Sequence, residues 1–154
     1  MKTIFIASDH AGFALKEKLK PYLVKIGLRV KDLGAHSGQR SDYPILAYNL
    51  AKEIAKGKNK RGGILICKSG IGNSIVANRV SGVRAALCYN AKAARLSREH
   101  NDSNVLVLGS AFTNEKQAKR ILSVWLNTRF KAGRHQRRLN LLKRIEKDLR
   151  RAKS

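Results

Sequence analysis

The chain has 154 residues, of which 43% are apolar, so it is long enough for one domain with a full hydrophobic core and too apolar for a disordered chain. Its formal net charge of +23 comes from 33 Lys and Arg against 10 Asp and Glu, which predicts non-specific polyanion binding. Residues 129–154 hold 11 basic and 2 acidic residues, or +9, which leaves +14 on the rest of the chain. Only 6% of the residues are aromatic, which argues against a nucleic-acid reader that stacks bases.

The cysteine count and the apolar runs restrict the compartment. Cys67 and Cys88 offer neither a disulfide framework nor the paired spacing of a zinc site. Residues 1–7 contain an apolar run too short for the core of a signal peptide, and no later run is long enough to span a bilayer. The sequence therefore predicts a soluble, cytoplasmic protein.

Strand patterns alternate with helical patterns along the whole chain, without an internal repeat or a linker, so residues 1–154 are predicted to form one domain. In chain order we predict a strand at Lys2–Ala7, a helix at Phe13–Ile26, a strand at Leu28–Leu33, a helix at Ile45–Lys56, a strand at Gly63–Cys67, a helix at Ser74–Val80, a strand at Val83–Cys88, a helix at Ala91–His100, a strand at Asn104–Leu108, a helix at Asn114–Thr128 and a last basic helix at about Arg134–Arg151. Strict alternation of this kind favours a parallel sheet with helices on both faces.

The stretch Gly62–Asn73, GGILICKSGIGN, is the strongest candidate for chemistry. A buried strand stops at Cys67 and continues into a turn of small residues before a helix. Ligands of open α/β sheets bind beyond the carboxyl ends of the strands, where free backbone N–H groups favour an anion and a cysteine thiolate. Gly70 and Gly72 allow a close approach of the backbone to a ligand. The same pattern also fits a buried structural cysteine before a tight turn.

Two familiar phosphate-binding motifs are excluded by the spacing of the glycines. In a Walker-type loop a flexible glycine-rich segment precedes the Lys-Ser pair, whereas the residues between Gly62 and Lys68 form a strand. A dinucleotide fingerprint needs three glycines, but Gly70 and Gly72 are followed by Asn73, Ser74 and Ile75, and the turn follows the third strand instead of the first.

Six blocks of the sequence resemble ribose-5-phosphate isomerase type B and follow that family's order over nearly the whole chain: Asp9–Gly12, Ser41–Pro44, Gly62–Cys67, Ser69–Gly72, Ser97–Asp102 and Gly133–Gln136. The resemblance implies a Rossmann-like three-layer αβα sandwich with a five-stranded parallel sheet. It also implies a homodimer or homotetramer that interconverts D-ribose 5-phosphate and D-ribulose 5-phosphate in the pentose phosphate pathway, without a metal or a cofactor.

In an aldose-ketose isomerase a base moves a proton between C1 and C2, and the charge of the enediolate formed between must be stabilised. Cys67 resembles the family's base. The backbone N–H groups of the next turn are expected to form the anion hole and to bind substrate, and this set consists of Lys68, Ser69, Gly70, Ile71 and Gly72. Ser69 is also counted among the catalytic residues.

Ring opening of the cyclic sugar needs an acid-base group before isomerisation. His100 resembles the family's ring-opening residue, with Asp9 as a helper that also binds substrate and Asn101 beside it, since imidazole both gives and accepts protons near neutral pH. For His100 the alternative is a role at a helix C-terminus, where the helix dipole favours a cation.

By resemblance, the phosphate group is expected to bind His10, Arg134 and Arg138. The guanidinium group of an arginine donates two parallel hydrogen bonds to phosphate oxygens. A solvated basic helix face remains the alternative for Arg138. Tyr43 is expected either to close over the sugar or to pack beside Pro44. No role is predicted for His36 or His135.

The chain departs from the family pattern at Lys68, where a glycine is usual, and at Ala111, where an arginine often binds phosphate. Two other functions remain open. One is the isomerisation of a six-carbon sugar phosphate, such as allose or galactose 6-phosphate. The other is nucleic-acid binding on the same scaffold, which only the charge suggests.

The last helix carries a stripe of apolar side chains that the preceding elements do not need. The stripe consists of Leu139, Leu142, Ile145 and Leu149. We expect it to pack on a second subunit, in a dimer whose active site is shared between the two chains.

Overall fold

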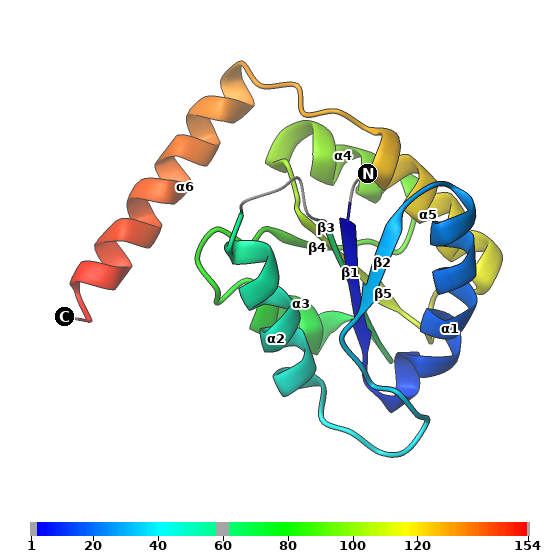
Figure 1. Ribbon diagram of the computed structural model, residues 1–154. Coiled ribbons are helices and arrows are strands. Elements are labelled where there is room, and N and C mark those ends of the chain that lie inside the picture. The colour runs from blue at the N-terminus through cyan, green and yellow to red at the C-terminus, as the bar shows by residue number, and fades with distance from the viewer. Residues whose placement is uncertain (1–2, 58–61, 154) are drawn as a thin grey trace.

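The computed structural model describes residues 3–57 and 62–153, so Lys2 and Ser154 lie outside the described residues (Figure 1). In chain order the elements are β1 (Thr3–Ser8), α1 (His10–Lys25), β2 (Arg29–Asp32), α2 (Tyr43–Ala55), β3 (Gly62–Cys67), α3 (Ile71–Ala77), β4 (Ala85–Leu87), α4 (Ala91–Asn101), β5 (Val105–Gly109), α5 (Glu115–Asn127) and α6 (Arg134–Arg151).

The strands form one five-stranded sheet in the order β2-β1-β3-β5-β4, and every pair is parallel. Side chains alternate between the two faces of each strand. On β3, Ile64 and Ile66 pack with α1, α4 and α5, while Leu65 packs with α2 and α3. The predicted three-layer αβα fold is confirmed, and all strands end at one edge of the sheet. None of the described helices is long and apolar enough to cross a membrane.

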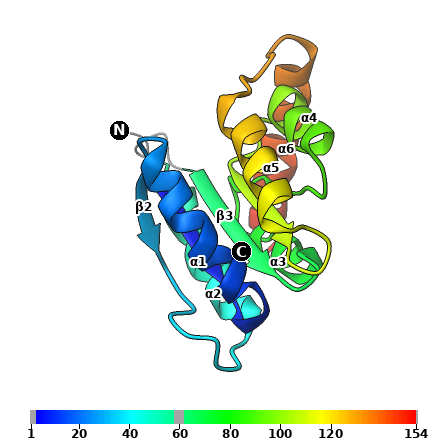
Figure 2. The same cartoon turned by 90° about the vertical axis from the view of Figure 1, so that its right-hand side faces the viewer.

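Helix α6 leaves this sandwich and runs along its side (Figure 1). Figure 2 shows α4, α5 and α6 gathered on the side of the molecule away from β2. Only His135 and Leu139 of α6 are buried, whereas Leu142, Ile145 and Leu149 keep 40%, 56% and 59% of their surface exposed. Leu139 is therefore covered within the chain, and most of the apolar stripe lies open.

Two helices begin earlier than the apolar periodicity indicates. Helix α1 starts at His10 instead of Phe13 because the Asp9 carboxylate accepts a hydrogen bond from the Gly12 N–H at 3.1 Å and caps the helix. Helix α2 starts at Tyr43 instead of Ile45, since Pro44 has no N–H and suits the first turn. Both starts place residues of the candidate site on the first turn of a helix.

The region around α3 and β4 also differs from the predicted bounds. Helix α3 starts at Ile71 and ends at Ala77, three residues short of the predicted end at Val80. Strand β4 spans Ala85–Leu87 instead of Val83–Cys88, because the Arg84 N–H donates to the Asn104 side chain at 2.8 Å and not to a neighbouring strand. The other bounds shift by one or two residues, and α6 has the predicted bounds.

Candidate active site

The ends of β1 and β3 bring a carboxylate and a thiol to the same edge of the sheet. Ser8 pairs with Ile66, so Asp9 and Cys67 follow neighbouring strands at the same height. Both side chains are buried. The Cys67 Sγ accepts a hydrogen bond from the Gly70 N–H at 3.2 Å. The thiol predicted to act as the base therefore lies at this edge and is hydrogen-bonded to the turn that follows it.

The turn after Cys67 requires its two glycines. Gly70 has a φ of +83°, and a Cβ there would lie 2.4 Å from the Leu87 side chain. A Cβ on Gly72 would lie 2.5 Å from the ring of Tyr43. The Tyr43 ring therefore lies against the turn that follows Cys67.

Two backbone N–H groups of this turn already donate hydrogen bonds within the protein. The Ile71 N–H donates to the Ser69 hydroxyl at 3.2 Å, and the Gly70 N–H faces Cys67. Lys68 is exposed, and among described residues other than glycine only Asp102 and Ala132 have a positive φ. A lysine therefore fits at position 68 without the left-handed backbone that favours glycine.

Tyr89 is a neighbour of the turn that the sequence did not indicate. Its hydroxyl donates to the Ser69 carbonyl at 2.8 Å, and its ring lies 4.9 Å from that of Phe112. Tyr89 and Ser69 are far apart in sequence, so no local pattern signals this contact. The contact helps to fix the turn that carries Cys67.

A pocket of about 440 Å³ opens beside Asp9 and is lined by Asp9, His10, Arg40, Ser41, Asp42, Tyr43, Pro44 and Ile45. The His10 backbone N–H donates to the Ser41 hydroxyl at 3.1 Å. The His10 Nδ1 lies 3.2 Å from both the N and the O of the Ser41 backbone. The loop before α2 is thus joined to the first turn of α1, and the imidazole lies at the pocket.

A buried lysine, which the sequence analysis missed, holds the start of the same loop. The Lys16 Nζ donates to both Asp32 carboxylate oxygens at 2.7 and 2.8 Å and to the Ala35 carbonyl at 2.6 Å. Burial raises the pKa of Asp32, but hydrogen bonds from Lys16 and Lys20 outweigh it and leave this pKa below its ordinary value. Lys16 sits on the apolar side of α1, where its charge gives no periodic signal.

His100 and Asn101 lie at the opposite edge of the sheet. They form the end of α4, immediately before β5, whose first residue Val105 pairs with Gly63 at the start of β3. The Arg84 Nε donates to the carbonyls of Asn101 and Asp102 at 2.9 and 3.0 Å. These contacts fix the end of α4 at the edge where the strands begin.

The first turn of α6 joins His100 there. The imidazole rings of His100 and His135 stack with centroids 4.2 Å apart. Burial lowers the pKa of His135, and the positive charges of His100 and Arg134 lower it further. Arg134 and Arg138 are exposed on the same helix. His135, which had no predicted role, thus docks α6 onto α4 and sets where both arginines lie.

One chain therefore carries two separate groups of the expected site residues. The six residues of β3 are joined by five steps of roughly 3.3 Å, so the two edges lie about 17 Å apart. The first group comprises Asp9, His10, Tyr43 and Cys67 with its turn, and the second comprises His100, Asn101, Arg134 and Arg138. Figure 1 shows the same separation: β1 points down toward the first group, and α6 begins at the upper end. The fold does not join His100 to Cys67 within one chain.

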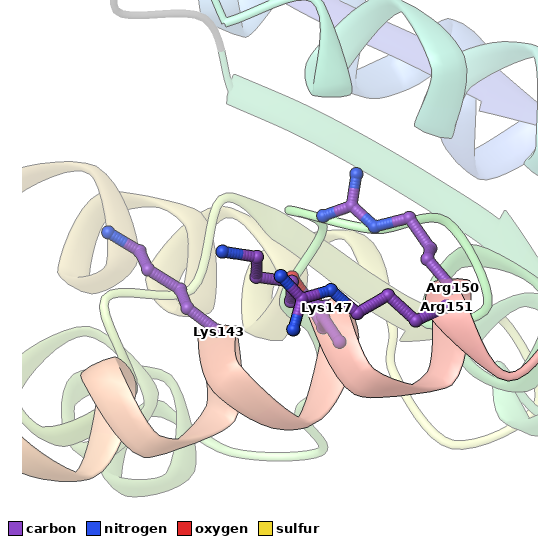
Figure 3. A pocket seen from close by; sticks show the side chains of 5 residues that line it. Lys143, Lys147, Arg150 and Arg151 are labelled. Atoms are coloured by element: carbon purple, nitrogen blue, oxygen red, sulfur yellow. The ribbon is translucent and has the colours of Figure 1, made fainter.

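The far end of α6 forms a basic surface, shown in Figure 3, around a cavity of about 560 Å³. Its cations are Lys143, Lys147, Arg150 and Arg151. Glu146 also lines the cavity, but its carboxylate accepts hydrogen bonds from the Ser81 hydroxyl at 3.0 Å and the Gly82 N–H at 3.2 Å. Four cations against one carboxylate leave this surface positively charged.

The fold and the edge that carries Cys67 define an α/β protein of the Rossmann-like class with its candidate site beyond the strand ends. Residues 4–142 match the model of the family described as ribose/galactose isomerase. The chain belongs to this family and is an isomerase.

Individual relatives agree with this assignment over nearly their full lengths. The chain is 44% identical to ribose-5-phosphate isomerase B of Escherichia coli over 95% of this chain and 97% of that protein. The structure of ribose-5-phosphate isomerase B from Clostridium thermocellum is 42% identical, with a TM-score of 0.92 over 97% of this chain and 99% of that one. The Mycoplasma genitalium enzyme, solved with bound ribulose-5-phosphate, is 41% identical, with a TM-score of 0.90 over 95% and 97%.

Proposed function

We propose that this isomerase interconverts D-ribose 5-phosphate and D-ribulose 5-phosphate through an enediolate, without a metal, in the pentose phosphate pathway of the cytoplasm. The observation that carries the proposal is the buried Cys67 thiol on the last residue of β3, with the Gly70 N–H directed at its sulfur at 3.2 Å. The names of the relatives support the five-carbon substrate. Two free cysteines suit a reducing compartment.

In the isomerisation step Cys67 acts as the base. Its thiolate takes the proton from C2 of the open-chain aldose, and the C–H electron pair forms the C1–C2 double bond of the enediolate. The hydroxyl proton then moves from O2 to O1, and return of the first proton from Cys67 to C1 gives the ketose, with the C2–O2 double bond formed from the electron pair left on O2. Backbone N–H groups of the Lys68–Gly72 turn stabilise the negative oxygen, where one such donor is worth about 3 kcal/mol.

Ring opening and phosphate binding use residues of both groups. His100 moves the proton between the ring oxygen and the C1 hydroxyl, with Asp9 as its helper, and Asn101 binds the sugar. Arg134, Arg138 and His10 hold the phosphate. Tyr43, which already lies against Gly72, covers the substrate.

Because the two groups lie at opposite edges of one sheet, we propose that each active site is completed by a second copy of the chain. One subunit provides Cys67 and Asp9, and the other provides His100, Arg134 and Arg138. The open stripe of α6 supports this arrangement, since Leu142, Ile145 and Leu149 border an apolar groove beside β4 that a second subunit would cover. The assembly is a homodimer or a pair of such dimers.

The experiment that tests the function measures ribulose 5-phosphate formed from ribose 5-phosphate by the purified chain, with and without a chelator. We expect turnover that the chelator leaves unchanged. Allose 6-phosphate and galactose 6-phosphate are measured in parallel, because six-carbon isomerisation is the remaining catalytic alternative. A higher kcat/KM for either hexose phosphate would replace the five-carbon assignment, and loss of activity with the chelator would contradict the metal-free mechanism.

The basic surface on α6 favours a second, weaker activity, the non-specific binding of polyanions. Its four cations lie on one exposed part of a single helix (Figure 3). We propose that this surface contributes to nucleic-acid adhesion without sequence preference, which does not require an active isomerase.

A further inference from the structure

Asn73 is a buried polar residue without an explained partner. It lies on the first turn of α3, directly after Gly72, and only 1% of its surface is exposed. Within residues 3–57 and 62–153, its Nδ2 is buried and donates no hydrogen bond. Buried amide donors in folded proteins nearly always have a partner, so an exception calls for a cause.

The fold places Asn73 on the same side of the sheet as Cys67. Ala77 follows Asn73 by one helical turn and packs in the core that contains Leu65. Cys67 lies two residues after Leu65 and therefore on the same face of β3. Asn73 is thus nearer than Ala77 to the carboxyl edge of the sheet, in the layer that holds the thiol.

Asp9 belongs to this layer as well, because it continues the face of β1 on which Phe5 and Ala7 pack with α2 and α3. The buried Ser8 hydroxyl, which also lacks a partner among the described residues, continues the opposite face with Ile4 and Ile6. Ser8 therefore lies on the other face of the sheet from the Asn73 amide, which is on the side of the candidate site. The third such group among the described residues, the Thr113 hydroxyl, lies in the segment after β5.

A second asparagine on the same helix shows how a structural amide is used here. Asn78 is the C-cap residue directly after α3, and its Nδ2 donates to the carbonyls of Ser74 and Ala85 at 3.0 and 2.9 Å. Its Oδ1 accepts from the Ala85 N–H at 2.8 Å. Asn78 thus stabilises the fold, whereas the Nδ2 of Asn73 adds no such hydrogen bond and costs free energy in the free protein.

We propose that Asn73 is a catalytic residue whose Nδ2 donates a hydrogen bond to an oxygen of the C1–C2 enediolate, an assignment that rests on the proposed function. When the C2–H bond breaks, its proton goes to Cys67 and its electron pair forms the C1–C2 double bond. The displaced electrons of the carbonyl then leave a negative charge on O1. The amide neither gains nor loses a proton in this step. It finds its missing acceptor as the charge develops, so the bond strengthens in the transition state.

The test replaces the amide by an apolar side chain of similar size, in Asn73→Leu and, should that variant fold poorly, in Asn73→Met. Removal of one donor to a developing oxyanion is expected to lower kcat about 100-fold and to change KM less than about threefold. The melting temperature should stay equal or rise, because an unpaired buried amide is removed. The isotope effect on kcat with ribose 5-phosphate deuterated at C2 should increase, since proton transfer becomes more rate-limiting.

Asn78→Leu is the matched control, because it removes a satisfied amide from the same helix. It should lower the melting temperature and leave kcat of the folded protein unchanged. An unchanged kcat in Asn73→Leu and Asn73→Met, a rise in KM alone, or a fall in melting temperature like that of Asn78→Leu would overturn the assignment. A wild-type chain that isomerises no sugar phosphate would overturn the proposed function itself, and this assignment with it.

Discussion

A mixed-dimer experiment tests directly whether the active site is shared between two chains. One parent carries Cys67→Ala, and the other carries Arg134→Ala with Arg138→Ala. Each parent alone should be nearly inactive, because every site in its homodimer lacks either the base or the phosphate-binding cations. The two groups lie about 17 Å apart along β3 in a single chain, which is too far for both to reach one sugar phosphate.

The recovered rate can be calculated from the symmetry of a dimer. After dissociation and random pairing of equal amounts, about half of the dimers are mixed, and each mixed dimer holds one intact site and one site with both defects. The expected activity is therefore about a quarter of the wild-type rate per chain. If both groups belonged to the same chain, every site in every dimer would keep one defect and the rate would stay at the level of the parents.

The assay measures ribulose 5-phosphate formation before and after mixing, while subunit exchange is followed independently with a tagged chain. A matched control mixes Cys67→Ala with Asp9→Asn, whose defects lie at the same edge, and no recovery is expected from that pair. A mixture of Cys67→Ala with His100→Asn should recover activity, because His100 lies with the arginines. Absence of recovery in the arginine mixture, with exchange demonstrated, would refute the shared site.

Three further predictions concern single residues and the surface charge. Cys67→Ala should lower kcat by about 10²- to 10⁴-fold with little change in fold, whereas Cys88→Ala should cost about 1 kcal/mol of stability and little activity. Because burial raises the pKa of Cys88 to about 11, iodoacetamide at pH 8 should modify Cys67 first, and mass spectrometry showing loss of activity with only Cys88 alkylated would reverse the two roles. His100→Asn should slow turnover of cyclic ribose 5-phosphate far more than that of ribulose 5-phosphate, and equal losses in both directions would exclude a role limited to ring opening. Duplex DNA should bind weakly, with an affinity that falls steeply as the salt concentration rises. The binding should persist when sugar phosphate is present, and binding that does not depend on salt would contradict an electrostatic origin.

Element bounds that depend on local side-chain periodicity were predicted correctly, whereas bounds that depend on a single side-chain hydrogen bond were not. The last helix was predicted with its observed bounds because it is long, amphipathic and isolated from the sheet. Helix α1 was predicted to start too late, because its first turn depends on one hydrogen bond from the Asp9 side chain and not on apolar spacing. The short β4 was overestimated because a side chain twenty residues away, Asn104, takes the N–H of Arg84.

The sequence by itself determined the alternation of strands and helices, the end of a buried strand at Cys67, and the need for small residues in the turn after it. These features depend on side-chain periodicity and backbone sterics, which act between near neighbours. The tertiary structure alone decided the strand order β2-β1-β3-β5-β4, the buried contacts of Lys16 and the burial of the Asn73 amide without a partner. It also placed His100 and Cys67 at opposite edges, because every helix that follows a parallel strand runs back to the edge where the next strand begins. His100 and Cys67, which the sequence predicts to act in one mechanism, are therefore separated within one chain.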